Sequence, residues 1–471
     1  MLGMPSSLLA SLALLVGLSS QSLAQTGTEP ARNEAAPVAS PASTLFREWI
    51  DAFNAGDKVA IKAFYGKYLD DPDATPALDR VEDTCGFDVL RVETQATLSM
   101  NVLLAERCLP ALQRLTIEFA AEGDAKPKTF RLRPLAQSRQ GAIDSMAQTA
   151  DRLAARDKFA GSLLVAHGDK LLWSQSWGTL NKTVEVPITP DTPMFLASSG
   201  KMFTAVAVLQ LVEQGKIELD APFGRYLTDY PNQDMAKATI RHLLQHRGGT
   251  GDTGILARNE GANRARVKTI DDIIKLNGSR GPLFPPGSKM DYSNYGFLLL
   301  GAVVERVSGE SYYDYIKRHV FEPAGMTNAG FPDLDHLQDV AIGYTTFFGE
   351  EPELTSSVDI LPWRGMPDGG GVASANDMLK FFRALNAGKL LSPELLSLAT
   401  TPGDPSWYGL GFITVRGDYA YWGHGGHASG MSVAAGYYPE DDTIYVCLAT
   451  RDTACDRLYF AWHHRTFGPT K

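Results

Sequence analysis

Cysteine is scarce in this sequence: its 471 residues include only Cys85, Cys108, Cys447 and Cys455. So few cysteines exclude a disulfide-built scaffold, and none has the C-x-x-C spacing of zinc or redox sites. Long runs of Lys and Arg are missing too, and 44 basic against 54 acidic residues leave a formal net charge of -10. Nucleic acid and anionic membrane surfaces are therefore poor candidate partners.

Metal and cofactor motifs are also missing. The nine histidines include no H-E-x-x-H, and neither a G-x-x-x-x-G-K-[ST] nor a convincing G-x-G-x-x-G follows a strand. His242 and His246 stand four apart and could share a helix face, but no carboxylate between them could act as a base. We expect both to be hydrogen-bonded structural residues, and we expect no metal and no cofactor.

The N-terminus predicts export. The apolar stretch from Leu8 to Leu18 is shorter than the ~18 residues that a membrane span needs. Ser22-Leu23-Ala24 then resembles a signal-peptidase site. We expect a signal peptide over residues 1–24, a disordered linker over 25–43, and a periplasmic or secreted protein with no membrane span after cleavage. A frayed N-terminal helix is the alternative.

A small α+β module is expected over residues 44–135. Apolar residues recur at helical spacing from Leu45 to Phe53 and from Ile61 to Leu69, and then alternate with a period of two around Ile117. By this pattern and by the phrase FREWIDAFNAGDKVAIKAFY, the module resembles the cystatin-like, nuclear-transport-factor-2-like domains attached to some secreted hydrolases.

Export would allow a disulfide between Cys85 and Cys108. Cys447 lies in the apolar run from Ile444 to Leu448 and is interpreted as a core residue.

Residues 142–471 are expected to form one larger domain. A helix from about Ala142 leads into a strand pair between Phe159 and Trp177, and further strands lie between Tyr408 and Leu448. Because strands flank a long, largely helical insert, we expect the two ends of this region to build one antiparallel sheet.

The first candidate site lies at the start of a predicted helix. Ser198 and Lys201 are three residues apart, so they share one helix face. Lys201 opens an almost wholly apolar helix, although lysine is rarely buried. A desolvated ammonium has a lowered pKa and can act as a base on a neighbouring hydroxyl. The alternative is a helix-capping serine with a lysine that reaches solvent.

A second candidate is the loop before the apolar helix Phe297 to Val307, where Tyr292 and Asn294 stand two apart. Beside an ammonium the pKa of a phenol falls from its ordinary value of about 10, so Tyr292 could shuttle a proton while Asn294 binds a substrate carbonyl. The alternative is an ordinary turn before a helix.

The third candidate, His424-Gly425-Gly426-His427, lies between two strand-like runs. Paired glycines at a strand edge let a substrate backbone approach closely, and a histidine there can donate to a developing negative charge. A hairpin turn with solvent-facing histidines is the alternative.

In this order, S-x-x-K, Y-x-N and H-G-G resemble the penicillin-recognising serine hydrolase superfamily. They are similar to its class C β-lactamase-like branch, which holds esterases, D-Ala-D-Ala carboxypeptidases and D-amino-acid amidases. The resemblance implies an α/β fold in which helices flank an antiparallel sheet beside an all-helical lobe. It covers about Ala142 to Phe467, and its supporting stretches are Ile188 to Pro193, Leu243 to Gly249, Pro323 to Met326 and Gly369 to Ser374.

The resemblance also implies a role for each motif residue. Ser198 would be the acylated nucleophile, Lys201 would help to deprotonate it, and Tyr292 would accept and donate the shared proton. Asn294 would contact a substrate amide. The backbone N–H groups of Ser198 and His427 would form the oxyanion hole.

Two departures from the family pattern concern substrate binding. His424 stands where the family's K-T-G motif has a lysine, which helps β-lactam-destroying members to bind the carboxylate of the antibiotic. Gly425 lacks the hydroxyl of the K-T-G threonine. A further departure, outside substrate binding, is Ser199-Gly200, which is more flexible than the usual pair between serine and lysine. A poor β-lactamase is therefore expected.

The expected function is a serine hydrolase that forms a Ser acyl-enzyme on a small-molecule ester, amide or D-peptide. The alternative is a non-catalytic binding or self-assembling protein that retains the fold, which intact Ser198, Lys201 and Tyr292 argue against. The physiological substrate, the oligomeric state and the role of the small module stay open at this point.

Overall fold

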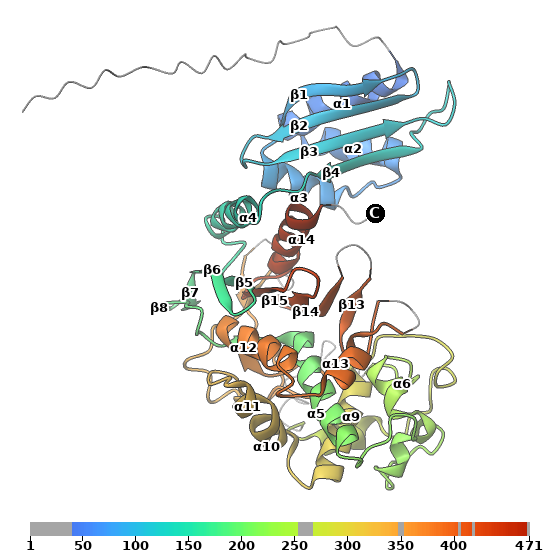
Figure 1. Cartoon of the computed structure of the whole chain (residues 1–471), viewed down its shortest axis with the longest axis vertical. Helices are drawn as coiled ribbons and strands as arrows, with labels where there is room; N and C mark the ends of the chain where they lie inside the picture. Colours follow the sequence, from blue (N-terminus) through green and yellow to red (C-terminus); the bar gives the residue numbers. More distant parts are fainter. Residues whose placement is uncertain (1–39, 253–266, 347–352, 404–406, 417–419, 469–471) are drawn as a thin grey trace, which may run out of the picture.

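The computed structural model of the chain describes residues 40–252, 267–346, 353–403, 407–416 and 420–468 (Figure 1). The expected signal peptide and most of the expected linker lie outside these residues. Within the described ranges, no helix combines the length and the apolar character that a bilayer crossing requires.

The N-terminal module, residues 40–135, is an α+β unit with its own apolar core. Its first helix begins inside the segment expected to be linker, because the Ser40 side chain accepts a hydrogen bond from the Ser43 backbone and caps it. The strands pair antiparallel in chain order. The elements are α1 (Pro41–Ala55), α2 (Lys58–Leu69), α3 (Thr75–Thr84), β1 (Phe87–Gln95), β2 (Ser99–Glu106), β3 (Leu112–Glu118) and β4 (Thr129–Pro134).

The larger domain is built on a six-stranded antiparallel sheet of order β13-β14-β15-β16-β5-β6. The strands from the two ends of the domain meet where β16 pairs with β5, so the prediction of one shared sheet is confirmed. The strands are β5 (Gly161–His167), β6 (Lys170–Trp177), β13 (Ile413–Val415), β14 (Tyr421–Ala428), β15 (Met431–Tyr438) and β16 (Thr443–Ala449).

Helices cover both faces of this sheet, as the predicted fold class requires. Helices α4 and α14 pack on one face, and the long apolar helix α5 leads into the helical lobe on the other (Figure 1). The helices are α4 (Arg139–Ala154), α5 (Lys201–Glu213), α6 (Ile240–Leu244), α8 (Ile270–Asn277), α9 (Asn294–Ser308), α10 (Tyr312–Ile316), α11 (Glu322–Ala324), α12 (Ala375–Asn386), α13 (Pro393–Thr400) and α14 (Ala454–Phe467).

Short strand pairs complete the domain. They are β7 (Thr179–Asn181) with β8 (Val184–Pro187), β9 (Met194–Phe195) with β12 (Val372–Ala373), and β10 (Tyr344–Thr345) with β11 (Thr355–Ser356).

Both cysteine pairs are disulfides. Cys85 and Cys108 are joined within the N-terminal module, which confirms the pairing that the sequence analysis considered. The interpretation of Cys447 as a core residue is confirmed, because it is fully buried, but the sequence analysis missed its disulfide to Cys455 at the start of α14. The apolar run around Cys447 is correctly read as buried, but the eight-residue separation crosses a turn, so the sequence alone does not show the pairing.

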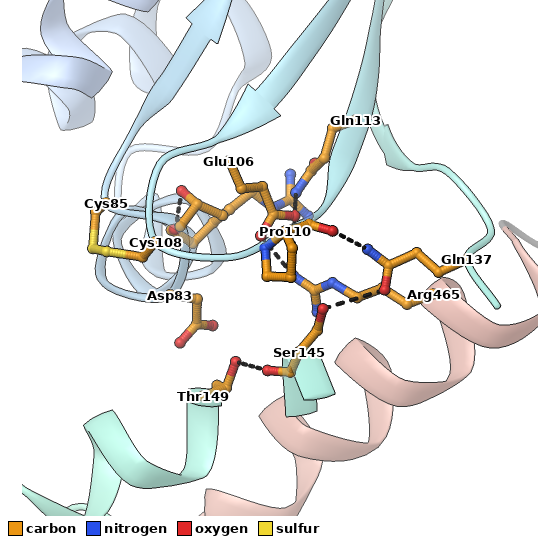
Figure 2. Close-up of polar contacts among 12 residues, drawn as sticks. Asp83, Cys85, Glu106, Cys108, Pro110, Gln113, Gln137, Ser145, Thr149 and Arg465 are labelled. Atoms are coloured by element: carbon orange, nitrogen blue, oxygen red, sulfur yellow. Dashed lines mark hydrogen bonds and ion pairs between the residues drawn. A yellow bond between two sulfur atoms is a disulfide. The ribbon is translucent and has the colours of Figure 1, made fainter. Parts of the chain in front are cut away.

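The N-terminal module is docked on α4 and α14 through buried charges. Figure 2 shows Arg465 of α14 reaching Glu106 at the end of β2, and its Nη2 lies 3.0 and 2.8 Å from the two carboxylate oxygens. Both side chains are almost fully buried, and Gln113 donates a further hydrogen bond to Glu106 at 2.7 Å. Earlier in α14, Arg457 makes ion pairs with α3 residues Asp79, Glu82 and Asp83.

We predict that Arg465→Met destabilises the protein strongly, because it leaves the Glu106 carboxylate buried without its cation. Removing one partner of a buried pair costs about 3–5 kcal/mol. Calorimetry should show a clearly lowered unfolding temperature, and a second replacement of Glu106→Leu should restore much of it. A single variant that unfolds at the wild-type temperature would contradict the importance of this pair.

Candidate active site

The predicted nucleophile lies on a tight turn between the sheet and the helical lobe. Ser198 is part of a short 3₁₀ turn, η1 (Ala197–Gly200), which runs directly into α5. The residue before it, Ala197, has a φ of +45°, a left-handed conformation that is unfavourable for alanine. A Cβ on Gly200 would lie 2.6 Å from the carbonyl oxygen of Gly370, so this position requires glycine. The Ser199-Gly200 pair is therefore tightly packed.

Lys201 is fully buried at the first position of α5. Its Nζ lies 3.3 Å from Ser198 Oγ and 2.7 Å from Asn294 Oδ1, and it also donates to the carbonyl oxygen of Asp368. Burial lowers the pKa of Lys201 to about 8, against the opposing effects of the Asp368 and Asp252 carboxylates. The sequence-based expectation of a desolvated lysine beside the serine is confirmed.

These contacts orient the amine. An ammonium has three N–H donors, and three oxygens surround Nζ. When Lys201 loses a proton, the Asn294 and Asp368 oxygens can still accept its two remaining N–H groups. The lone pair then faces Ser198 Oγ, which is the orientation a base needs to take the hydroxyl proton.

Tyr292 lies beside Ser198 and Lys201. Lys201 Nζ is 4.9 Å from the centre of its ring, and the Ser198 side chain is near enough to its phenol to act on the phenol pKa. The expectation that the ammonium lowers the pKa of this phenol is wrong. Burial raises the pKa of Tyr292, the Asp368 and Asp252 carboxylates add to this, and the Ser198 hydrogen bond opposes it only in part. Tyr292 is therefore a neutral phenol at physiological pH.

Asn294 begins α9 and is held at both ends of its amide. Its Oδ1 accepts from Lys201, and its Nδ2 donates to Asp252 Oδ2 at 3.3 Å. In this structure its amide supports the lysine, and its role as a substrate contact stays a prediction.

The H-G-G motif lies inside strand β14, and the expectation of a position between two strands is corrected. β13 pairs with β14 over Tyr421–Gly423 and its register ends just before the motif. The Ser199 hydroxyl donates to the His424 carbonyl at 3.2 Å, which ties the motif to the serine turn. A Cβ on Gly426 would lie 2.4 Å from the Leu196 carbonyl, so a glycine is needed for this contact.

His424 is buried, and its Nε2 is 2.9 Å from the Tyr408 hydroxyl. Burial, and then the nearby Lys201 charge, lower the pKa of His424 to about 3. It is consequently neutral near pH 7, as expected for an imidazole in place of a lysine. Its Nδ1 bonds to the Gly425 carbonyl.

His427, whose backbone N–H is one of the two predicted oxyanion donors, follows the H-G-G triplet. His427 pairs with Ser432 of β15, and its side chain is 2.7 Å from Asp456 of α14. The Asp456 hydrogen bond raises the pKa of His427. Its N–H as an oxyanion donor, together with that of Ser198, remains a prediction.

Several residues of the site were not found from the sequence. Asp368 and Asp252 approach Lys201 from two loops, and Tyr408 contacts His424 from a third. The run of glycines after Asp368 was the available signal, because it marks a loop that packs closely against the serine turn.

His242 and His246 do not combine into a metal site. The backbone N–H of Thr239 donates to His242 Nδ1 at 3.3 Å, whereas His246 Nδ1 accepts from the Ser293 backbone. In the described part of the chain, no group of three or more metal-type side chains comes together.

Known proteins with similar sequences belong to a single family. The sequence model of the family described as Beta-lactamase matches residues 146–464. The chain belongs to the Beta-lactamase family. Penicillin-binding protein 4* from Bacillus subtilis (strain 168) is 30% identical over 282 residues, which cover 56% of this chain and 61% of that protein. Esterase EstB from Burkholderia gladioli is 26% identical over 273 residues, which cover 50% and 68% respectively.

A solved structure shows the same architecture. The penicillin binding protein from Bacillus halodurans superposes with a TM-score of 0.61 and 28% identity, over 70% of this chain and 99% of that one. The relatives in this family are serine hydrolases. In this chain Ser198 Oγ lies 3.3 Å from Lys201 Nζ, which is 4.9 Å from the centre of the Tyr292 ring.

We predict that the reactivity of Ser198 follows the protonation of Lys201. The neutral amine is the base, so the rate of labelling by a fluorophosphonate should rise about tenfold per pH unit below the lysine pKa and level off above about 8. Lys201→Ala should react slowly with no such midpoint. A wild-type rate that does not change between pH 6 and pH 9 would contradict this assignment.

Proposed function

We propose that this protein hydrolyses small esters or amides through an acyl-enzyme on Ser198. The buried amine of Lys201 beside the serine hydroxyl is the observation that carries the proposal. Lys201 takes the proton of Ser198 Oγ, which attacks the substrate carbonyl carbon. The resulting oxyanion is stabilised by the N–H groups of Ser198 and His427.

Tyr292 completes the proton transfer as a neutral phenol. It donates its proton to the leaving group when the carbonyl–leaving-group bond breaks, and Lys201 then returns the proton that it took from Ser198 to the phenolate. Water then attacks the acyl-enzyme along the reverse route, which returns Ser198 to its starting state. Lys201 and Tyr292 therefore act as one unit around the serine.

The substrate class follows from the absence of a fixed charge at His424. A neutral imidazole bonded to Tyr408 is a weak partner for a substrate carboxylate, and Gly425 supplies no hydroxyl. Short acyl esters need no carboxylate pocket, and the similarity to Esterase EstB supports them as substrates. Amides of D-amino acids are the second class, whereas the non-catalytic alternative is disfavoured by the assembled Ser198, Lys201 and Tyr292.

Export of the protein is part of this proposal. Two disulfides, Cys85–Cys108 and Cys447–Cys455, are typical of proteins outside the reducing cytosol. They support a periplasmic or secreted location and removal of the predicted signal peptide. The order of helices followed by an antiparallel sheet supports the cystatin-like interpretation of the N-terminal module.

Covalent labelling tests the nucleophile. A fluorophosphonate probe should form one adduct, which peptide mapping should place on Ser198, and Ser198→Ala should lose both the adduct and the hydrolysis of p-nitrophenyl butyrate. Ser199→Ala is the matched control and should still be labelled. An adduct on Ser199, or none on folded protein, would refute the proposal.

We further predict that kcat/KM is higher for p-nitrophenyl butyrate than for nitrocefin at pH 7. Two weakened carboxylate contacts, each worth about 1–1.5 kcal/mol, lower recognition of the β-lactam roughly 30- to 150-fold. A Cβ on Gly425 would meet its nearest atom at 3.5 Å, which is an ordinary van der Waals contact, so a side chain can be attached at this position.

The double variant His424→Lys with Gly425→Thr should therefore raise the nitrocefin value and leave the ester value less affected. A wild-type enzyme that prefers nitrocefin would overturn the assignment of substrate class.

A further inference from the structure

His246 is a buried histidine that the proposed proton transfers do not use. It was singled out by its spacing from His242, yet the two residues have separate partners. His246 is 1% exposed, and its backbone has a φ of +57°, which is uncommon for a residue with a side chain. Its Nε2 is buried with no hydrogen-bond partner.

These features are unfavourable for stability. A left-handed conformation costs about 1–2 kcal/mol, and an unpaired buried donor costs about 1–3 kcal/mol. Such features concentrate at functional sites, where the surrounding structure holds them in place. If position 246 only had to fill space, an apolar residue would do so without a buried unpaired donor.

Three contacts of His246 are made to Tyr292 and to the residues directly before and after it. Its carbonyl oxygen accepts from the backbone N–H of Asp291 at 2.9 Å, and its Nδ1 accepts from the backbone N–H of Ser293 at 3.1 Å. These two bonds hold the residues on either side of Tyr292. The imidazole also packs against the Tyr292 ring in a tilted arrangement, with centroids 4.0 Å apart and planes inclined by 31°.

We propose that His246 is a positioning residue that holds the Tyr292 phenol against Ser198. The inference rests on the proposed function, because it assigns the support of the group that exchanges protons there. Tyr292 is 37% exposed, so without the contacts of His246 its side chain can turn away from the serine.

The protonation state of the imidazole suits this role. Because Nδ1 accepts from Ser293, the ring proton is on Nε2. The centre of the imidazole lies 4.6 Å from that of the Tyr408 ring and 5.1 Å from that of the Phe297 ring. Burial, followed by the charge of Lys201, lowers the pKa of His246 well below its ordinary value. The acceptor on Nδ1 is thus available throughout the neutral pH range.

The test compares two substitutions of His246 in the full-length protein. His246→Ala removes the acceptor and the ring, and misplacement of Tyr292 should lower kcat about 100-fold while KM changes little. His246→Asn keeps an acceptor oxygen near the position of Nδ1 and tolerates the left-handed backbone, so it should recover about a tenth of wild-type kcat. His242→Asn, four residues earlier in helix α6, is the matched control and should retain wild-type kcat.

A double-mutant cycle with Tyr292→Phe separates positioning from general stability. If His246 acts through the phenol, His246→Ala should cost less than about threefold once the phenolic oxygen is removed. An equal loss in both backgrounds, a change in KM alone, or unchanged kcat would overturn the inference. If His246→Ala does not fold by circular dichroism, His246→Asn carries the same comparison.

The same experiment distinguishes the two proposals. A wild-type protein that neither hydrolyses p-nitrophenyl butyrate nor is labelled at Ser198 refutes the proposed function. An active wild-type protein with independent effects of His246 and Tyr292 refutes only the positioning role.

Discussion

The desolvation of Lys201 is the constraint on which the chemistry of this structure depends. An ammonium taken out of water loses its hydration, and the oxygens around Nζ replace it only in part. Two of those oxygens belong to neutral amides and the third to the serine itself. Without a carboxylate in direct contact, burial outweighs the more distant Asp368 and Asp252 charges, which brings the lysine pKa to about 8. The fold thereby makes a base that works near neutral pH.

Close backbone contacts hold that lysine beside its nucleophile. The serine turn packs against Gly369 and Gly370 on one side and against Gly426 on the other, in each case at distances that a Cβ would block. Segments more than 150 residues apart therefore meet at Ser198, with little room for the turn to move. Preorganisation of this kind lets a serine react without first rearranging its surroundings.

The sequence predicted the parts of the molecule that local pattern determines. Apolar periodicity located α1, α2, α5 and α9, and the strands at both ends of the larger domain predicted their common sheet. The S-x-x-K spacing gave the serine and lysine because both residues belong to one helical turn. α3 was missed because it is short and polar on average, and only Ala77 and Thr84 of its residues are buried, so few apolar residues mark it in the sequence.

Contacts between distant loops could not be predicted in the same way. Asp368 meets Lys201 through its backbone carbonyl, which any residue carries, so its side-chain type gives no signal. The prediction that the Tyr292 pKa falls took only the Lys201 ammonium into account. In the structure Lys201 faces the phenol ring, while burial and two carboxylates act on the hydroxyl in the opposite direction. The sign of such a shift depends on the whole environment, which sequence spacing does not describe.

The groups around Lys201 share one property that gives the site its proton chemistry. Burial lowers the pKa of His246 and His424 and raises that of Tyr292 and Tyr408, so each is held in its neutral form. Each of these shifts avoids a further charge in a pocket of low dielectric constant. A proton that leaves Ser198 therefore meets one strong acceptor, the lysine amine, and two donors, Lys201 and Tyr292, that can return it. The neutral histidines serve this arrangement by shaping and fixing the phenol and the strand while carrying no charge that would compete for the proton.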